Sequence, residues 1–81
     1  SNRVRTRTTV SISQAQFDAL VSFDFNTGRL NALLPDINAN HFGNVPGIMN
    51  QFTHSQGVEL PGLVTRRAAE GTLFSTGIYP P

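Results

Sequence analysis

The sequence predicts a mainly α fold, a small helical unit of three to four short helices. Two observations indicate this class. Apolar residues recur at helical spacing in several segments between residues 13 and 76, and Ser, Pro and Gly stand where helices begin and end. The chain has 81 residues and no Cys, so we expect one small domain without disulfides or thiolate metal ligands.

The first segment, residues 3–12, alternates polar and β-branched residues. Alternation with a period of two is typical of a half-buried strand. From periodicity alone, the sequence predicts a short strand here.

The next segment, from about residue 13 to Gly28, predicts the best-defined helix. Ser13 and Gln16 have the spacing of a capping box, which satisfies free backbone N–H groups at a helix start. Glycine is a common residue just past a helix end. Asp24 falls on the apolar stripe, where it needs a partner or water, and we interpret it as a partly exposed residue near the helix end. The expected stripe follows helical spacing and consists of Phe17, Leu20, Val21 and Phe25, widened by Phe23.

A second short helix is predicted from the spacing of Leu30, Leu33, Leu34 and Ile37, with Asn31 as its cap. Pro35 limits this helix, because proline is tolerated only in the first turn.

Two further helices should open at prolines. Pro46 predicts a third helix that carries Ile48, Met49 and Phe52 and ends at Gln56-Gly57. Pro61 predicts a fourth, in which Gly71 weakens the last turn. We expect the tail, residues 77–81, to dock as an irregular cap or to remain mobile. The expected inner face of the fourth helix comprises Leu63, Val64, Arg67, Ala68, Leu73 and Phe74.

Composition limits the possible partners. Hydrophobic residues make up 38% and charged residues 14%, so the chain is too apolar for a disordered tail and part of its surface should meet another molecule. A net charge of +1 from six Arg and no Lys does not indicate nucleic acid. No apolar run approaches the roughly 18 residues of a membrane span. The chain starts with Ser1 rather than Met, so we expect a piece of a longer protein.

Few residues offer catalytic chemistry, and none is assigned as catalytic. Glycosidases need two carboxylates, one of them an acid with a raised pKa. We expect Asp18 to be exposed near a helix start, and Glu70 to form a surface ion pair with Arg66 and Arg67.

The remaining reactive residue types suggest no site either. His41 and His54 do not have metal-ligand spacing, so no metal or other cofactor is expected. No nucleophile-elbow motif surrounds a Ser. The arginines at 3, 5 and 7 could touch an anionic polymer, although a solvated terminal segment is the favoured interpretation.

Two motifs carry a family resemblance. The run Ile12-Ser-Gln-Ala-Gln-Phe-Asp-Ala-Leu-Val-Ser-Phe-Asp-Phe-Asn-Thr-Gly28 resembles the helix-opening segment of phage-type lysozymes, or endolysins, of glycoside hydrolase family 24. Leu60-Pro-Gly-Leu-Val-Thr-Arg-Arg-Ala-Ala-Glu70 resembles the segment that opens the late helix of that family. Between them, residues 32–42 are similar to a third family stretch, and Phe52 stands where a Trp is common.

The resemblance implies the carboxy-terminal helical lobe of a lysozyme-like fold. Residues 1–11 would be the end of the interlobe segment, a helical alternative to the strand, and residues 12–81 the lobe. The catalytic Glu of the family would lie in an amino-terminal lobe outside this chain, which would be a partner of this one. By the same resemblance, Asn26, Phe25 and Asn31 would contact the substrate, and Gly28, Arg66 and Phe52 would support the site.

The function implied is part of a muramidase domain that cleaves the β-1,4 bond between N-acetylmuramic acid and N-acetylglucosamine in peptidoglycan. It would act on the bacterial cell wall, in the periplasm or outside the cell, and this chain alone would not be catalytic. One alternative is a non-catalytic module, derived from a lysozyme, that binds peptidoglycan or a protein. Another is an unrelated small helical bundle.

Overall fold

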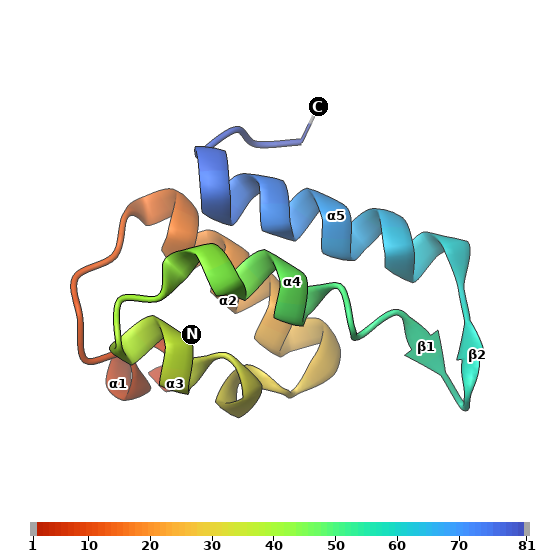
Figure 1. Cartoon of the computed structure of the whole chain (residues 1–81), viewed down its shortest axis with the longest axis horizontal. Helices are drawn as coiled ribbons and strands as arrows, with labels where there is room; N and C mark the ends of the chain where they lie inside the picture. The colour runs from red at the N-terminus through yellow and green to blue at the C-terminus, as the bar shows by residue number, and fades with distance from the viewer. Residues whose placement is uncertain (1, 81) are drawn as a thin grey trace.

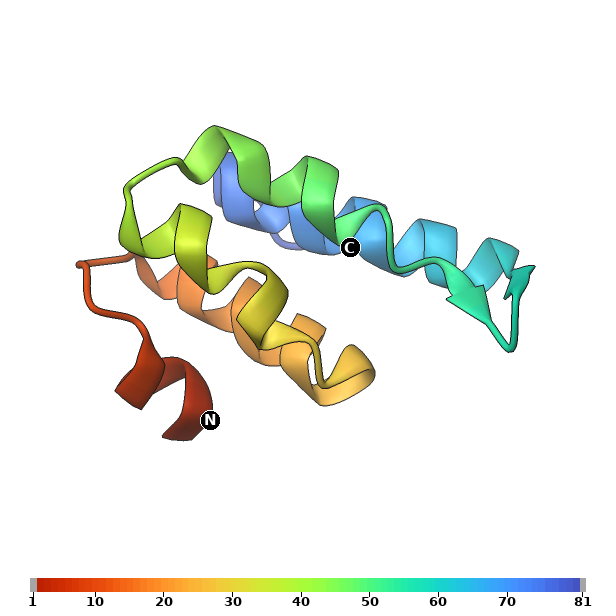
Figure 2. The ribbon, with the colours of Figure 1, turned by 60° about the horizontal axis from the view of Figure 1, so that its bottom comes forward.

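A computed structural model describes residues 2–80 and confirms the mainly α prediction. The longest helices are α2 (Gln14–Thr27) and α5 (Pro61–Thr76), which pack against each other, and α5 also packs on α4 (Val45–Met49) (Figure 1). The helix α1 (Asn2–Arg7) lies on the side of α2 away from α5 (Figure 2). Short connecting elements complete the chain, namely the 3-10 turns η1 (Leu30–Ala32) and η2 (Phe42–Asn44), the helix α3 (Leu34–Asn38), and the strands β1 (His54–Ser55) and β2 (Val58–Glu59).

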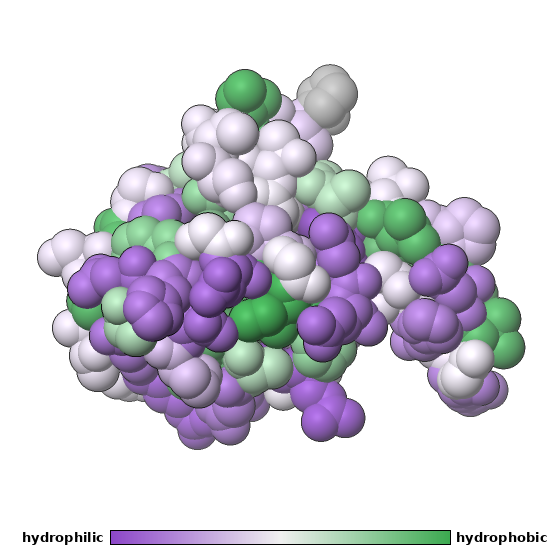
Figure 3. Space-filling view, viewed as in Figure 1, coloured by the Kyte–Doolittle hydropathy of each residue, from purple (hydrophilic) through white to green (hydrophobic). Residues whose placement is uncertain are grey.

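The core lies among α1, α2, the middle helices and α5. Eleven buried apolar residues form one cluster, so most of the hydrophobic stabilisation comes from contacts between helices. Outside it, the face seen in Figure 3 mixes hydrophilic surface with separate hydrophobic patches, among them one near the hairpin and one near the carboxy-terminal tail. The members of the cluster are Val4, Ala19, Leu20, Phe23, Leu30, Leu33, Ile37, Val45, Met49, Leu73 and Phe74.

The predicted strand at residues 3–12 is wrong, because residues 2–7 form α1. Contacts with residues far along the chain override the local alternation of polar and β-branched residues. Val4 is fully buried, and the Asn38 side chain donates to the Arg7 carbonyl at 3.1 Å and accepts from the Thr9 N–H at 2.8 Å. Asn38 therefore satisfies backbone groups where α1 ends.

The three arginines of this segment are exposed, as the prediction of a solvated stretch requires, and each also contacts another part of the chain. Arg3 pairs with Asp24 at 3.2 Å, and this ion pair supplies the partner that the carboxylate on the stripe of α2 needs. The guanidinium of Arg5 lies 5.5 Å from the Phe17 ring centroid, and Arg7 donates to the side-chain amide oxygen of Asn31 at 3.0 Å.

The beginning and end of α2 follow the prediction, and so does its buried stripe except at Phe25. The Ser13 hydroxyl accepts from the Gln16 N–H at 3.1 Å, and the Gln16 side chain accepts from the Ser13 N–H at 2.8 Å. Phe23 is buried and Phe25 is 89% exposed. At 100° per residue the two phenylalanines point to nearly opposite sides of the helix, so only one can face the core.

The predicted second helix divides into η1 and α3. Asn31 lies inside η1 and makes no cap, because the residue that precedes this turn is Arg29 and no side chain caps it. Pro35 lies in the first turn of α3, where its missing N–H costs nothing. Leu30, Leu33 and Ile37 are buried as expected.

The predicted third helix is shorter than expected and is followed by a hairpin that the sequence did not predict. Pro46 lies in the first turn of α4, and Phe52 lies beyond the helix end. Gln56 and Gly57 both have positive φ and join β1 to β2, with His54 opposite Glu59. Two positive-φ residues are typical of the tight turns that join hairpin strands.

Helix α5 starts at Pro61 as predicted, but its buried face differs in part from the predicted inner face. Val64 and Ala68 are exposed, whereas Glu70 and Gly71 are buried. A Cβ at Gly71 would lie 3.2 Å from the Pro46 Cβ, so the glycine allows α4 and α5 to approach closely. Gly71 does not lie in the last turn as predicted, since the helix continues to Thr76.

The tail docks against α2. Gly77 ends α5 in the left-handed conformation, and the Tyr79 hydroxyl donates to the Asp18 carboxylate at 2.6 Å. This hydrogen bond, together with one from Gln14, lowers the pKa of Asp18. Across residues 2–80, no helix has the length and apolar character needed to cross a membrane.

Candidate functional site

The end of α2 presents Asn26 at the surface. Gly28 takes the left-handed conformation with φ of 64°, and its N–H donates to the Asp24 carbonyl at 2.8 Å. The Thr27 hydroxyl donates to the Phe23 carbonyl at 2.8 Å and accepts from the Arg29 N–H at 3.0 Å. These local bonds end the helix and fix the turn that carries Asn26.

The amide of Asn26 joins α2 to α5. Its nitrogen donates to the Ser22 carbonyl at 2.8 Å, and its oxygen accepts from the Arg66 guanidinium. Both ends of the amide are therefore held, although the two partners belong to helices far apart in sequence. The structure thus brings together two of the residues that the sequence assigned to the site.

A buried polar cluster lies next to this contact. The Ser22 hydroxyl donates to the Glu70 carboxylate at 2.5 Å, and the Arg67 Nε lies 2.9 Å from its other oxygen. Arg67 is 1% exposed and Glu70 is 4% exposed, and the Arg67 guanidinium also lies 5.4 Å from the centroid of the Phe23 ring. The prediction that Glu70 forms a surface ion pair is wrong, because α5 packs this face of its helix against α2.

The cluster has shifted protonation equilibria. Burial raises the pKa of the Glu70 carboxyl, and the Ser22 hydrogen bond and the Arg67 and Arg66 charges oppose that rise. Burial also lowers the pKa of the Arg67 guanidinium, which Glu70 opposes. A raised pKa suits a general acid, but both oxygens of Glu70 are engaged inside the fold. The arrangement fits an internal anchor between two helices better than a proton donor.

The bonded residues Asn26 and Arg66 line two different grooves. Arg66 and Glu70 line the larger, of about 500 Å³, and Asn26 and Arg67 line the smaller, of about 280 Å³. The larger groove is lined by Ser22, Gly62, Thr65, Arg66, Ala69, Glu70, Leu73 and Pro80. The smaller groove is lined by Asn26, Thr27, Arg29, Phe52, His54, Leu63 and Arg67.

The other predicted site residues lie at different distances from this centre. Phe52 lines the smaller groove and packs edge-on against Phe23, with ring centroids 5.3 Å apart. Phe25 precedes Asn26 in the chain and exposes its ring to solvent. Asn31 lines neither groove and bonds to Arg7 of α1, so the structure does not bring it to Asn26.

The two histidines lie in separate places. His54 is exposed on β1, with its Nδ1 3.3 Å from the Thr53 hydroxyl, and His41 Nδ1 lies 3.9 Å from Asp36. Within residues 2–80, no three His, Cys, Asp or Glu side chains gather as metal ligands would.

Sequence reasoning missed Ser22 and Glu70 as neighbours of Asn26 and Arg66. A signal was present. Ser22 and Asn26 are four residues apart, as are Arg66 and Glu70, so each pair lies on one side of its helix. Two polar pairs on helices that pack against each other indicate a shared polar contact.

Comparison with known proteins identifies the family. A family model described as phage lysozyme matches residues 1–70. The chain is 42% identical over 72 residues to an endolysin of Bacillus phage B103, and 40% identical over 72 residues to an endolysin of Bacillus phage PZA. Each match covers 84% of this chain, and the chain spans only 27% and 28% of the length of these two relatives. No solved structure gives a significant match. The chain thus belongs to the phage lysozyme family.

Proposed function

We propose that this chain is the carboxy-terminal helical lobe of a muramidase that cleaves the β-1,4 bond between N-acetylmuramic acid and N-acetylglucosamine. In this proposal residues 1–11 end the segment that links two lobes, and the catalytic Glu belongs to the amino-terminal lobe. The observation that carries the proposal is the Asn26 amide held by Arg66, with each of the two residues lining a groove.

The role of this lobe is to position the saccharide. The five carboxylates of the chain all have partners within residues 2–80, which supports a role without an acid from this lobe. Asp18 accepts from Tyr79, Asp24 pairs with Arg3, and Asp36 accepts from Asn44. Glu59 accepts from the Thr53 hydroxyl, and Glu70 is engaged by Ser22 and Arg67.

The contact between Asn26 and Arg66 gives the site its chemistry. When the Arg66 guanidinium turns toward a carboxylate of the other lobe, the Asn26 oxygen becomes available to accept from a saccharide N–H or O–H. Phe25 and Phe52 would offer apolar surface to the sugar rings on either side of the amide. Correct orientation of the substrate can contribute several kcal/mol to the lowering of a reaction barrier.

Binding to purified peptidoglycan sacculi tests this proposal. We expect the chain to be retained by sacculi and Asn26→Ala to reduce that retention, because the substitution removes the amide. Asn50→Ala is the matched control, since Asn50 is exposed and lines neither groove. Equal retention of all three proteins, or no retention of any, would contradict a substrate role for Asn26.

A module that binds peptidoglycan without any catalytic lobe would show the same retention. The two functions differ in the full-length protein. The muramidase proposal predicts lysis by the full-length protein and a loss of lysis with Asn26→Ala. A full-length protein that binds sacculi and never lyses them would favour the binding module.

A further inference from the structure

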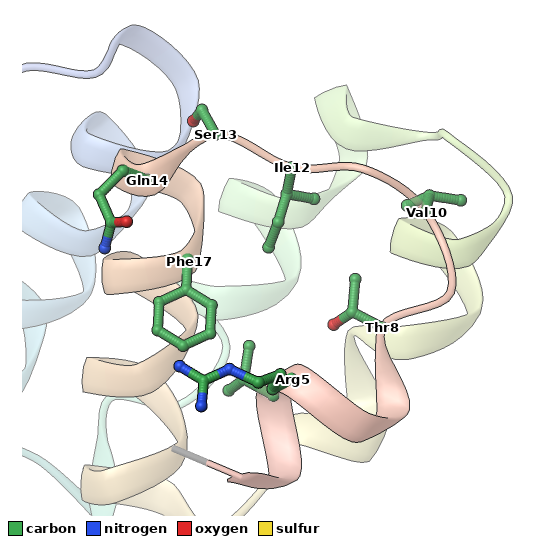
Figure 4. Close-up of a pocket in the computed structure, with 8 residues that line it drawn as sticks. Arg5, Thr8, Val10, Ile12, Ser13, Gln14 and Phe17 are labelled. Carbon is green, nitrogen blue, oxygen red and sulfur yellow. The ribbon is translucent and has the colours of Figure 1, made fainter.

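A second concave site lies on the α1 side of α2, between α1, residues 8–13 and the first turns of α2 (Figure 4). Its volume is about 340 Å³. Pockets that bind small molecules start at roughly 300 Å³, so this one has room for a small ligand only. None of the residues of the two grooves lines it.

The walls of this pocket are mixed: half of the lining residues are apolar, and the other half are Arg5, Thr8, Ser13 and Gln14. Val4 is fully buried, and Val10, Ile12 and Phe17 are half-buried and pack against the core. Figure 4 shows Val10, Ile12 and Phe17 around the pocket, from the segment of residues 8–13 and from α2. The apolar side chains can hold the apolar body of a ligand, and the polar side chains can hold a polar end.

The hydroxyl of Thr8 is the first polar feature of the pocket. Its oxygen is buried and has no hydrogen-bond partner within the part of the chain that the structure describes. The other buried side-chain atoms without a hydrogen bond, on Asp24, Arg67 and Glu70, take part in ion pairs. A buried hydroxyl without a partner is unfavourable, and in Figure 4 its oxygen points toward the interior of the pocket.

The guanidinium of Arg5 is the second polar feature. It lies over the Phe17 ring and, unlike that of Arg3, has no carboxylate partner among residues 2–80. No acidic residue lines the pocket. The pocket therefore combines an apolar part of its wall, a hydroxyl donor and one positive charge held in place by an aromatic ring.

We propose that this pocket binds a small amphipathic carboxylate. A short alkyl body would lie against Val10, Ile12 and Phe17. The carboxylate would accept hydrogen bonds from the Arg5 guanidinium and the Thr8 hydroxyl, which together satisfy its two oxygens. This inference does not depend on the function proposed for the Asn26 site.

Titration of the labelled chain with hexanoate, followed by amide NMR shifts, tests the proposal. We expect saturable millimolar binding, with shifts concentrated at residues 4–17. Hexanamide has the same body without the charge, and we expect it to bind at least about tenfold more weakly, because charge-assisted hydrogen bonds are the stronger ones. N-acetylvaline, which resembles a peptide terminus, is the second carboxylate probe. Binding of either probe supports recognition of a carboxylate. Tighter binding of N-acetylvaline identifies a peptide end as the source of the ligand, and tighter binding of hexanoate identifies a free acyl chain.

Three variants separate the pocket from general surface charge. Thr8→Val and Arg5→Met should each weaken hexanoate binding about tenfold. Thr8→Val should leave the chain folded, because valine keeps the shape and removes only the hydroxyl without a partner. Arg7→Met is the matched control, since it removes an arginine of the same helix that does not line the pocket. Equal binding of hexanamide, equal weakening by Arg7→Met, or no saturable binding would overturn the proposal.

Discussion

Replacing Arg67 with Met tests how the buried polar cluster holds α2 to α5. Arg67 is 1% exposed, and its ion pair with Glu70 compensates a carboxylate that is 4% exposed and accepts only one other hydrogen bond, from Ser22. Removing one partner of a buried pair costs about 3 to 5 kcal/mol, because the other charge is left without compensation. Domains have a stability of roughly 0.05 to 0.15 kcal/mol per residue, or about 4 to 12 kcal/mol for this chain. We therefore expect Arg67→Met to lose a large part of its folding stability at pH 7.

Glu70 gives this loss a defined pH dependence. Burial already raises its pKa above the ordinary value of 4.5, and removing Arg67 raises it further. A carboxyl with a raised folded pKa contributes stability that is fully present below the unfolded pKa and is lost as the pH rises through the folded pKa. The stability of Arg67→Met should therefore fall more steeply than that of the wild type as the pH rises from about 4.5 to 7.

Urea unfolding followed by circular dichroism at 222 nm measures both effects. The control is the double variant Arg67→Met with Glu70→Gln, which has no buried charge at either position. We expect the second substitution to restore most of the stability that the first removes, since neutral replacements of a whole buried pair are often tolerated. A loss below about 1 kcal/mol at pH 7, as for an exposed ion pair, would refute the buried-anchor account. A loss that Glu70→Gln leaves unchanged would refute it as well.

Three further substitutions test local features of the fold. Gly71→Ala should be less stable than Gly62→Ala by about 1 to 2 kcal/mol in urea unfolding, because only the former adds a Cβ against the proline of α4; equal stability would show that α4 can move aside. Ser13→Ala should lower the thermal midpoint and cost about 1 kcal/mol, since it removes the cap of α2, and an unchanged midpoint would contradict the capping role. Tyr79→Phe should move the pKa of Asp18 up toward its ordinary value in an NMR titration, because it removes the main hydrogen bond to that carboxylate; an unmoved pKa would show that the tail does not dock there.

Local chemistry accounts for the parts of the fold that the sequence predicted. The cap at Ser13, the stop at Gly28 and the openings at Pro46 and Pro61 depend on residues within one turn of each other. Such signals are independent of the rest of the chain. These helix ends could therefore be predicted without knowledge of the segments that pack against each helix.

Contacts between distant segments account for most of what the sequence could not predict. Residues 2–7 form a helix that Asn38 and Asp24 hold in place, although their own alternation favoured a strand. Glu70 is buried only because α5 packs on α2, where Ser22 binds it. Periodicity also could not decide between Phe23 and Phe25 for the core side of α2, since each continues an apolar stripe on its own side of the helix.

Only part of the candidate site could be predicted from the sequence. Asn26 and Arg66 were named because their motifs resemble those of a family, and the structure places them in contact. The same resemblance offered Asn31, which instead bonds to α1. The supporting residues Ser22 and Glu70 were missed because each was interpreted on its own helix, without the helix that faces it.

The central claim is that this lobe positions the saccharide and supplies no catalytic acid. Its most direct test is the release of reducing ends from sacculi incubated with the purified 81-residue chain, compared with the full-length protein under the same conditions. The account predicts release by the full-length protein and none by this chain, even where the chain is bound to the sacculi. Release of reducing ends by the chain alone would contradict the claim and would return Glu70 to consideration as the acid.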